Sequence, residues 1–110
     1  MSHWLFALPL FLSLVAGASP SLAATDNVPK FDIERSCRSE LSGGSSTGET
    51  MASCRADEQR ARAELGPRWS SFSAADKKLC IQETRIDGSP SYVELETCLD
   101  MTPSGRASQH

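Results

Sequence analysis

The sequence has very little histidine, and this narrows the chemistry that the protein can perform. Its two histidines are His3 and His110, one near each end of the chain. Sites in which histidine activates a serine or cysteine nucleophile, and most zinc sites, need a histidine held inside a folded domain. We therefore expect no catalytic residue of these kinds, no metal site and no other cofactor.

An excess of basic residues is also missing. The chain has 11 Lys and Arg against 14 Asp and Glu, a net charge of −3, whereas nucleic-acid-binding proteins normally carry a clear positive excess. We therefore expect no nucleic-acid partner. One segment does concentrate arginines, but acidic residues alternate with them: Arg55, Asp57, Glu58, Arg60, Arg62, Glu64 and Arg68. That pattern favours a solvated, ion-paired helix face.

Several recognisable motifs are absent. No two cysteines form a Cys-x-x-Cys pair, which disfavours a thiol–disulfide oxidoreductase and a closely spaced zinc site. The glycine-rich stretch "SGGSSTG" (42–48) contains no lysine and follows no strand, so it predicts a flexible loop rather than a phosphate-binding loop. Strand-like alternation of apolar and polar residues does not occur either.

Two acidic pairs are the remaining candidates for catalysis, Asp57 with Glu58 and Glu94 with Glu96. Paired carboxylates can hydrolyse glycosides when they face each other across a cleft. These pairs lie on short amphipathic segments that give no sign of a cleft, so we interpret them as solvated helix faces. We predict that the protein is not an enzyme.

The N-terminal segment predicts export. Residues 4–18 are almost wholly apolar and uncharged, and Ser21-Leu22-Ala23 offers the small-x-small pattern that a signal peptidase recognises. The apolar run is too short to span a bilayer comfortably. We predict a signal peptide over residues 1–23 with cleavage before Ala24, a periplasmic or secreted protein, and no stable membrane insertion after cleavage.

The rest of the chain predicts an all-α domain of four helices. We expect a linker over 24–30, a helical domain over 31–102 and a disordered tail over 103–110. The helices begin near residue 32, at Thr50, after Ser73 and after Ser91, with capping-box patterns at the last two sites. Gly66-Pro67 predicts a kink or break in the second helix. The helices would form two antiparallel hairpins.

The four cysteines predict two disulfides, because an exported domain of this size usually needs covalent cross-links. Cys37 and Cys54 lie at similar distances from the glycine loop, and Cys80 and Cys98 at equal distances from the "DGSP" turn. In antiparallel hairpins each pair is level, so we predict Cys37–Cys54 and Cys80–Cys98. A chain turn at Gly66-Pro67 would instead pair Cys54 with Cys80 and leave Cys37 for Cys98.

Four stretches carry a resemblance: "FDIERSCR", "CRADEQRARAEL", the Trp69–Cys80 pattern W-x-x-F-x-x-A-D-x-x-x-C, and "SYVELETCLDM". Over roughly residues 31–101 the chain resembles a group of small exported four-cysteine helical proteins of rhizobial-type alphaproteobacteria. That group has no activity attached to it, so the resemblance transfers no functional residue. Gly66-Pro67 departs from the pattern, since similar sequences continue a helix there.

These observations predict a binding module of the periplasm or cell envelope. Trp69 is the candidate partner-binding residue, because a kinked helix can leave a large aromatic ring partly exposed, although core packing is the commoner role for such a residue. The alternative is an inhibitor of an envelope-directed hydrolase such as a lysozyme. This alternative rests on a weaker likeness to periplasmic lysozyme-inhibitor domains, in their cysteine-stapled helices only.

Overall fold

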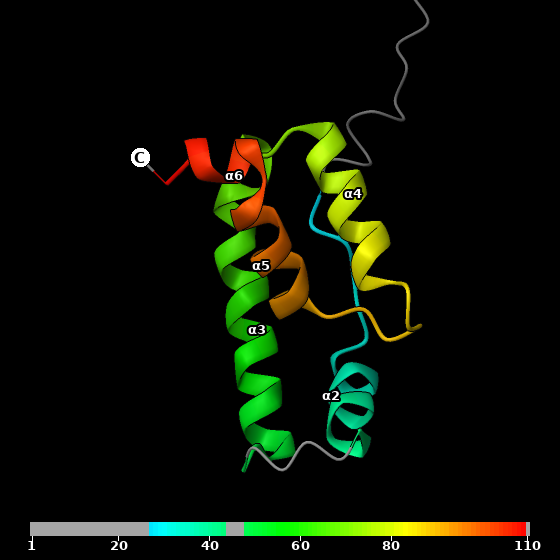
Figure 1. The fold of residues 1–110 in the computed structure, drawn as a ribbon. Helices are drawn as coiled ribbons and strands as arrows, with labels where there is room; N and C mark the ends of the chain where they lie inside the picture. Colours follow the sequence, from blue (N-terminus) through cyan, green and yellow to red (C-terminus); the bar gives the residue numbers. More distant parts are fainter. Residues whose placement is uncertain (1–26, 44–47, 110) are drawn as a thin grey trace, which may run out of the picture.

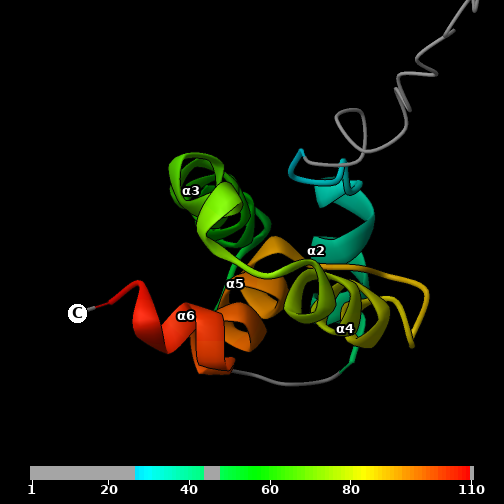
Figure 2. The same cartoon turned by 90° about the horizontal axis from the view of Figure 1, so that it is seen from above.

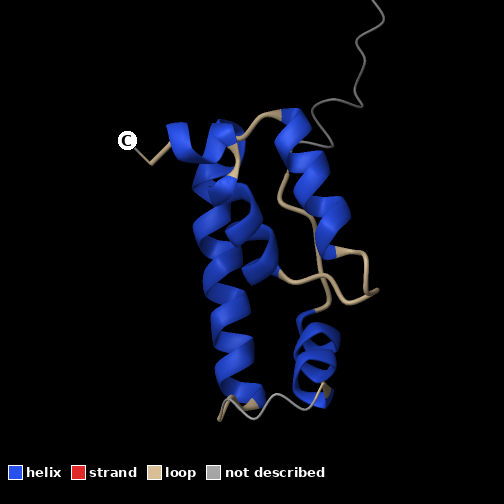
Figure 3. Ribbon diagram, in the orientation of Figure 1, coloured by secondary structure: helices blue, strands red, loops and turns tan. Residues whose placement is uncertain are grey.

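A computed structural model describes residues 27–43 and 48–109 of the protein, and this part of the chain contains helices and no strand (Figure 3). The predicted all-α fold is therefore confirmed. The elements are α2 (Ile33–Ser42), α3 (Met51–Arg68), a 3₁₀ turn η1 (Trp69–Ser71), α4 (Ala74–Thr84), α5 (Tyr92–Met101) and α6 (Pro103–Ala107). The predicted signal peptide lies outside the described residues.

Side-chain caps begin the four predicted helices. In each case a hydroxyl or carboxylate oxygen accepts a bond from the backbone N–H three residues later: Asp32 from Arg35, Thr50 from Ser53, Ser73 from Asp76 and Ser91 from Glu94. Only the Thr50 site is a reciprocal capping box, with Ser53 as its partner. The boxes predicted at Ser73 and Ser91 are incomplete, because the carboxylates of Asp76 and Glu94 bind other helices.

Helix α3 continues through Gly66-Pro67 and ends at Arg68, so of the predicted kink or break the break is wrong. Pro67 is the second-last residue of the helix and deprives only the carbonyl of Ala63 of its partner. Ala63 is exposed, so water can satisfy that carbonyl. The chain turns later, through η1 and the extended residue Phe72.

Helix α3 contacts its own hairpin partner α2 and also α5 of the second hairpin. Figure 1 shows α2 beside the first part of α3 and α5 beside its second part, and Figure 2 shows α5 between α3 and α4. The disulfides are Cys37–Cys54, with Cα atoms 5.7 Å apart, and Cys80–Cys98, with Cα atoms 5.6 Å apart. The preferred pairing is confirmed, and the alternative that required a turn at Gly66-Pro67 is excluded.

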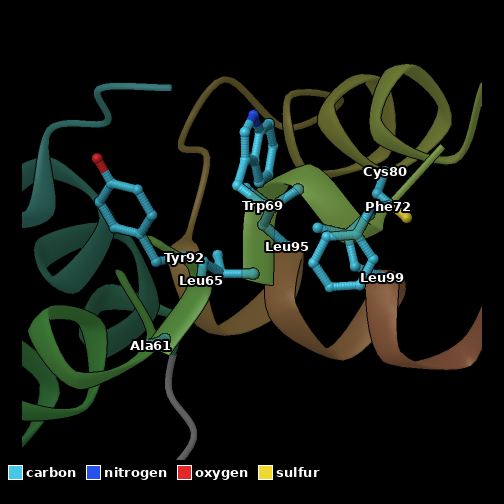
Figure 4. Close-up of a cluster of buried hydrophobic side chains, with 8 residues drawn as sticks. All are labelled: Ala61, Leu65, Trp69, Phe72, Cys80, Tyr92, Leu95 and Leu99. Carbon is cyan, nitrogen blue, oxygen red and sulfur yellow. The ribbon is translucent and has the colours of Figure 1, made fainter. Parts of the chain in front are cut away.

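The core lies where α3, η1, α4 and α5 meet (Figure 4). It consists of Ala61, Leu65, Trp69, Phe72, Cys80, Tyr92, Leu95 and Leu99. Tyr92 also holds the chain that precedes α2: its ring lies 4.8 Å from that of Phe31, and its hydroxyl donates to the carbonyl of Pro29 over 2.8 Å. Val28 packs against the same core. The predicted linker over 24–30 therefore extends too far, since its last residues belong to the domain.

Residues 103–107 form α6, so the prediction of a disordered tail is wrong for this segment. Thr102 caps the helix by accepting a bond from the Gly105 N–H over 3.1 Å, and Gly105 is buried against the backbone of Leu99. Asp76 of α4 accepts bonds from the N–H and the hydroxyl of Ser104. The helix docks through a glycine and hydroxyl groups, which leave no apolar periodicity in the sequence.

Candidate functional site

Trp69 lies in the core and not on the surface. Its side chain is 4 % exposed, and it lies among the core residues drawn in Figure 4. The centroid of its ring lies 6.4 Å from that of Phe72 in an edge-on arrangement, and the Nζ of Lys77 lies 5.0 Å from the centroid of the indole. The commoner role expected for such a residue, core packing, is therefore the one observed, and the alternative of a partly exposed indole is contradicted. Trp69 therefore presents no surface for a partner.

The acidic residues Asp57 and Glu58 have different environments, although they are adjacent. Asp57 is solvated and pairs with Arg60 at 3.0 Å, as predicted. Glu58 is 2 % exposed, so its assignment to a solvated face is wrong. The sequence contains a signal that identifies it: Glu58 lies four residues after Cys54 and three before Ala61, on the buried stripe of α3.

Glu58 ties α3 to the start of α5. Its carboxylate accepts a bond from the Tyr92 N–H over 2.6 Å and another from the hydroxyl of Ser91. Ser91 in turn donates its N–H to Thr84 over 2.9 Å, and the Thr84 hydroxyl donates to Glu94 over 3.0 Å. A negative charge at a helix N-terminus is favourable, so this buried carboxylate anchors α5 on α3.

Glu94 and Glu96 have separate partners and do not act as a pair. Glu96 lies near Arg68, whose Nη1 is 4.0 Å from its Oε2. Burial, followed by the neighbouring carboxylates of Glu64 and Asp100, raises the pKa of Glu96 to about 7, while Arg68 opposes the shift. Arg68 also pairs with Asp100. This polar group joins the end of α3 to α5.

The arginines of α3 contact acids or aromatic rings. The contacts are Arg55 with Glu34, Arg60 with Asp57, Arg68 with Asp100, and Arg62 over the ring of Tyr92. The predicted ion pairing is present, but two of the pairs join α3 to other helices. These side chains form no isolated basic patch.

An acidic groove of about 400 Å³ lies between α2, the first half of α3 and the loop before α5. None of the described residues in its lining is Lys or Arg. Six of them carry carboxylates: Glu40, Glu49, Asp57, Glu58, Asp87 and Glu94. Burial, followed by the charges of Glu49, Glu58 and Glu94, raises the pKa of Glu40. The groove is therefore strongly negative.

Part of this acidic groove has the residue types of a metal-binding site. One ligand atom each of Glu40, Glu49 and Cys54 lies within 4.8 Å of the others. The sulfur of Cys54, however, is bonded to Cys37 and is not a thiolate. Two carboxylates remain, which do not fit the ligand sets of structural zinc sites.

An apolar groove of about 550 Å³ lies between α4 and α5. Its walls include Leu79, Val93 and Met101, whose side chains are 51 %, 38 % and 65 % exposed. Its charged lining residues are Asp76, Glu83 and Glu94, and no described residue in the lining is basic. The apolar groove adjoins the acidic groove, because Val93 and Glu94 line both.

The fold and the two grooves define a small all-α domain closed by two disulfides. No protein-family model, curated protein or solved structure matches the chain. The resemblance to the rhizobial-type group stays a prediction. Among the described helices none has both the length and the apolarity needed to cross a membrane.

Proposed function

We propose that this protein is an exported, non-enzymatic binding module that engages a protein of the periplasm or cell envelope through the apolar groove. The observation that carries the proposal is the exposure of Leu79, Val93 and Met101 along one groove. Burying apolar surface contributes about 25 cal/mol per Å². A partner that covers these side chains therefore gains more here than on the charged faces of the domain.

The disulfides support this proposal because each holds the wall of a groove. Cys54 lines the acidic groove and Cys98 lines the apolar groove. A binding surface that is ordered before the partner arrives loses less conformational entropy on association. Two disulfides also fit an oxidising compartment.

Export is tested by the mass of the mature chain. Protein recovered from the periplasm of an exporting host should begin at Ala24, since Ser21-Leu22-Ala23 precedes that position. Intact-mass measurement reads the N-terminus directly. A recovered chain that still begins at Met1 would contradict cleavage.

Binding is tested by affinity capture from periplasmic extract, with variants that separate the groove from general apolar exposure. Leu79→Asp places a charge on the groove wall. Ile86→Asp is the matched control, because Ile86 is 83 % exposed but lines neither groove. A specific partner should be retained by the wild type and the Ile86 variant and lost by the Leu79 variant. The same set of proteins on all three baits would argue against the groove.

Inhibition of an envelope-directed hydrolase such as a lysozyme is the second candidate, and the acidic groove favours it. Six carboxylates without a basic lining residue would complement a positively charged enzyme surface. The test is digestion of dye-labelled peptidoglycan by lysozyme with increasing amounts of the protein. The Glu49→Lys variant should inhibit digestion less than the wild-type protein does. If the wild-type protein leaves the digestion rate unchanged, the inhibitor function is excluded.

A further inference from the structure

The lining of the apolar groove restricts what can occupy it. Its wall is apolar at Leu79 and Met101, while its charged positions are acidic at Asp76, Glu83 and Glu94. We infer that the occupant is an amphipathic helical segment of a protein partner, with apolar side chains on one face and lysine or arginine beside them. This inference rests on the proposed function, because it names the partner of the same groove.

A helix fits this groove better than an extended peptide. A polyproline segment docks on aromatic side chains, and no described residue in the lining of this groove is aromatic. Any other extended segment pairs its backbone groups at a strand edge, and the part of the chain that the structure describes contains no strand. Without such an edge, the backbone N–H and C=O groups would face the apolar wall unpaired, which costs free energy. A helix satisfies its own backbone and presents side chains to a groove between two other helices.

The charge of the groove disfavours a second copy of this chain. Symmetric dimers bury the same patch of both subunits against itself. In this case Asp76, Glu83 and Glu94 of one copy would lie near the same three carboxylates of the other. No basic side chain among the described lining residues would neutralise them, so a partner with positive charge is favoured.

The same charge disfavours a lipid surface. Membrane leaflets that attract proteins electrostatically do so through anionic headgroups, which bind Lys and Arg. The exposed Leu79 and Met101 lie with acidic side chains beside them, and anionic headgroups would be repelled. A cationic protein segment has the opposite preference.

The two grooves are continuous, so a basic segment bound in the apolar groove can also meet the carboxylates of the acidic groove. Val93 and Glu94 line both, so a segment lying in the apolar groove has one end directed toward the acidic groove. Lysine or arginine at that end can reach carboxylates such as Glu49 and Asp87. These contacts lie at the surface, so added salt should weaken them.

Three labelled synthetic peptides of about 18 residues, five helical turns, test the inference by fluorescence anisotropy. The first has leucines at helical spacing flanked by lysine, the second carries glutamate in place of lysine, and the third has the composition of the first in scrambled order. The first should bind the full, exported protein about tenfold more tightly than either of the others. Equal binding of the first and second peptides would overturn the charge match. Equal binding of the first and scrambled peptides would overturn the helical face.

Variants assign the binding to the groove. Leu79→Asp and Glu83→Lys should each weaken the binding of the first peptide by about tenfold. Ile86→Asp and Glu64→Lys are the controls and should have little effect, since neither Ile86 nor Glu64 lines a groove. Binding that survives both groove variants would contradict the inference.

Two further measurements distinguish the other occupants. Co-sedimentation of the protein with vesicles containing phosphatidylglycerol should show no binding, and vesicle binding that Leu79→Asp abolishes would assign the groove to lipid. Sedimentation velocity should show a monomer, and a dimer that Leu79→Asp dissociates would assign it to a second copy. If Leu79→Asp removes a captured protein partner but the peptides show no preference for lysine, the proposed function stands and this inference fails.

Discussion

Replacing Glu58 with alanine should destabilise the domain by about 2–4 kcal/mol. Glu58 is 2 % exposed, and its carboxylate accepts bonds from the Tyr92 N–H and the Ser91 hydroxyl. A hydrogen bond to a charged group contributes about 1.5–3 kcal/mol, and a buried donor left without a partner costs about 1–3 kcal/mol. Removing a buried charge offsets part of this loss.

Two variants test the reasoning behind this figure. Glu58→Gln keeps an acceptor for Tyr92 and can donate its amide N–H to Ser91, so it should cost only about 1 kcal/mol. Asp57→Ala is the matched control: Asp57 forms only an exposed pair with Arg60, and such pairs contribute about 0–1 kcal/mol.

Urea unfolding measures all three variants. Far-UV circular dichroism follows the helices, and the fluorescence of Trp69 follows the core between the hairpins. Coincident transitions permit a two-state free energy, and an unchanged slope shows that the variants change stability alone. A Glu58→Ala protein as stable as the Asp57→Ala protein would refute the anchoring of α5 by a buried carboxylate.

Three further predictions test other parts of the fold. Removing the second disulfide with Cys80→Ser and Cys98→Ser should cost about 2–5 kcal/mol in urea unfolding, and a wild-type midpoint would show that the bridge adds nothing. Gly105→Ala should cost about 3 kcal/mol or more, because the new Cβ would overlap the backbone carbonyl oxygen of Leu99 in α5, which has no flexible side chain to move aside. Gly66→Ala is its control, since Gly66 has open space around it and alanine there should add about 0.5–1 kcal/mol; equal effects would contradict the docking of α6. The pKa of Glu96 is raised to about 7, so the folded state binds the proton of this carboxyl group more tightly than the unfolded state does. The stability that this protonation contributes is therefore complete below the unfolded pKa of 4.5 and is lost as pH rises toward 7. Relative to Glu96→Gln, the wild type should therefore lose stability between about pH 5 and about pH 8, and parallel pH profiles would refute the shift.

The two grooves give the domain different kinds of surface on either side of α5. Val93 and Glu94 lie in the first turn of that helix and belong to both. The Glu58 anchor fixes the start of α5, and the Cys80–Cys98 bridge fixes its second half. Variants that loosen α5 should therefore weaken binding at both grooves, whereas Leu79→Asp and Glu49→Lys each change one.

Local patterns in the sequence determined the four longer helices and the disulfides. A capping side chain such as Thr50 or Ser91 acts on a backbone group three residues away, so its effect is readable from the sequence alone. The disulfide pairing followed from the positions of the cysteines relative to two short turns, because helical rise per residue is constant. Both inferences depend on distances along the chain.

Gly66-Pro67 and the C-terminal segment show where local reasoning was insufficient. Proline usually disrupts a helix, but in the last turn of α3 it affects one exposed carbonyl. Helix α6 has no apolar stripe, and it forms because Gly105 fits against α5 and Ser104 reaches Asp76. The first outcome depends on where Pro67 lies in the helix, and the second on a contact with α4, which is distant in sequence.

Only the tertiary structure decided the environment of Glu58 and the existence of the grooves. Glu58 lies on the buried stripe of α3, yet its partners come from a segment 33 and 34 residues away. The acidic groove gathers carboxylates from three separate segments of the chain. Helical spacing can indicate that Glu58 is buried, but it does not indicate the partners of Glu58 or the grooves, because these depend on which side chains meet in space after the helices have packed.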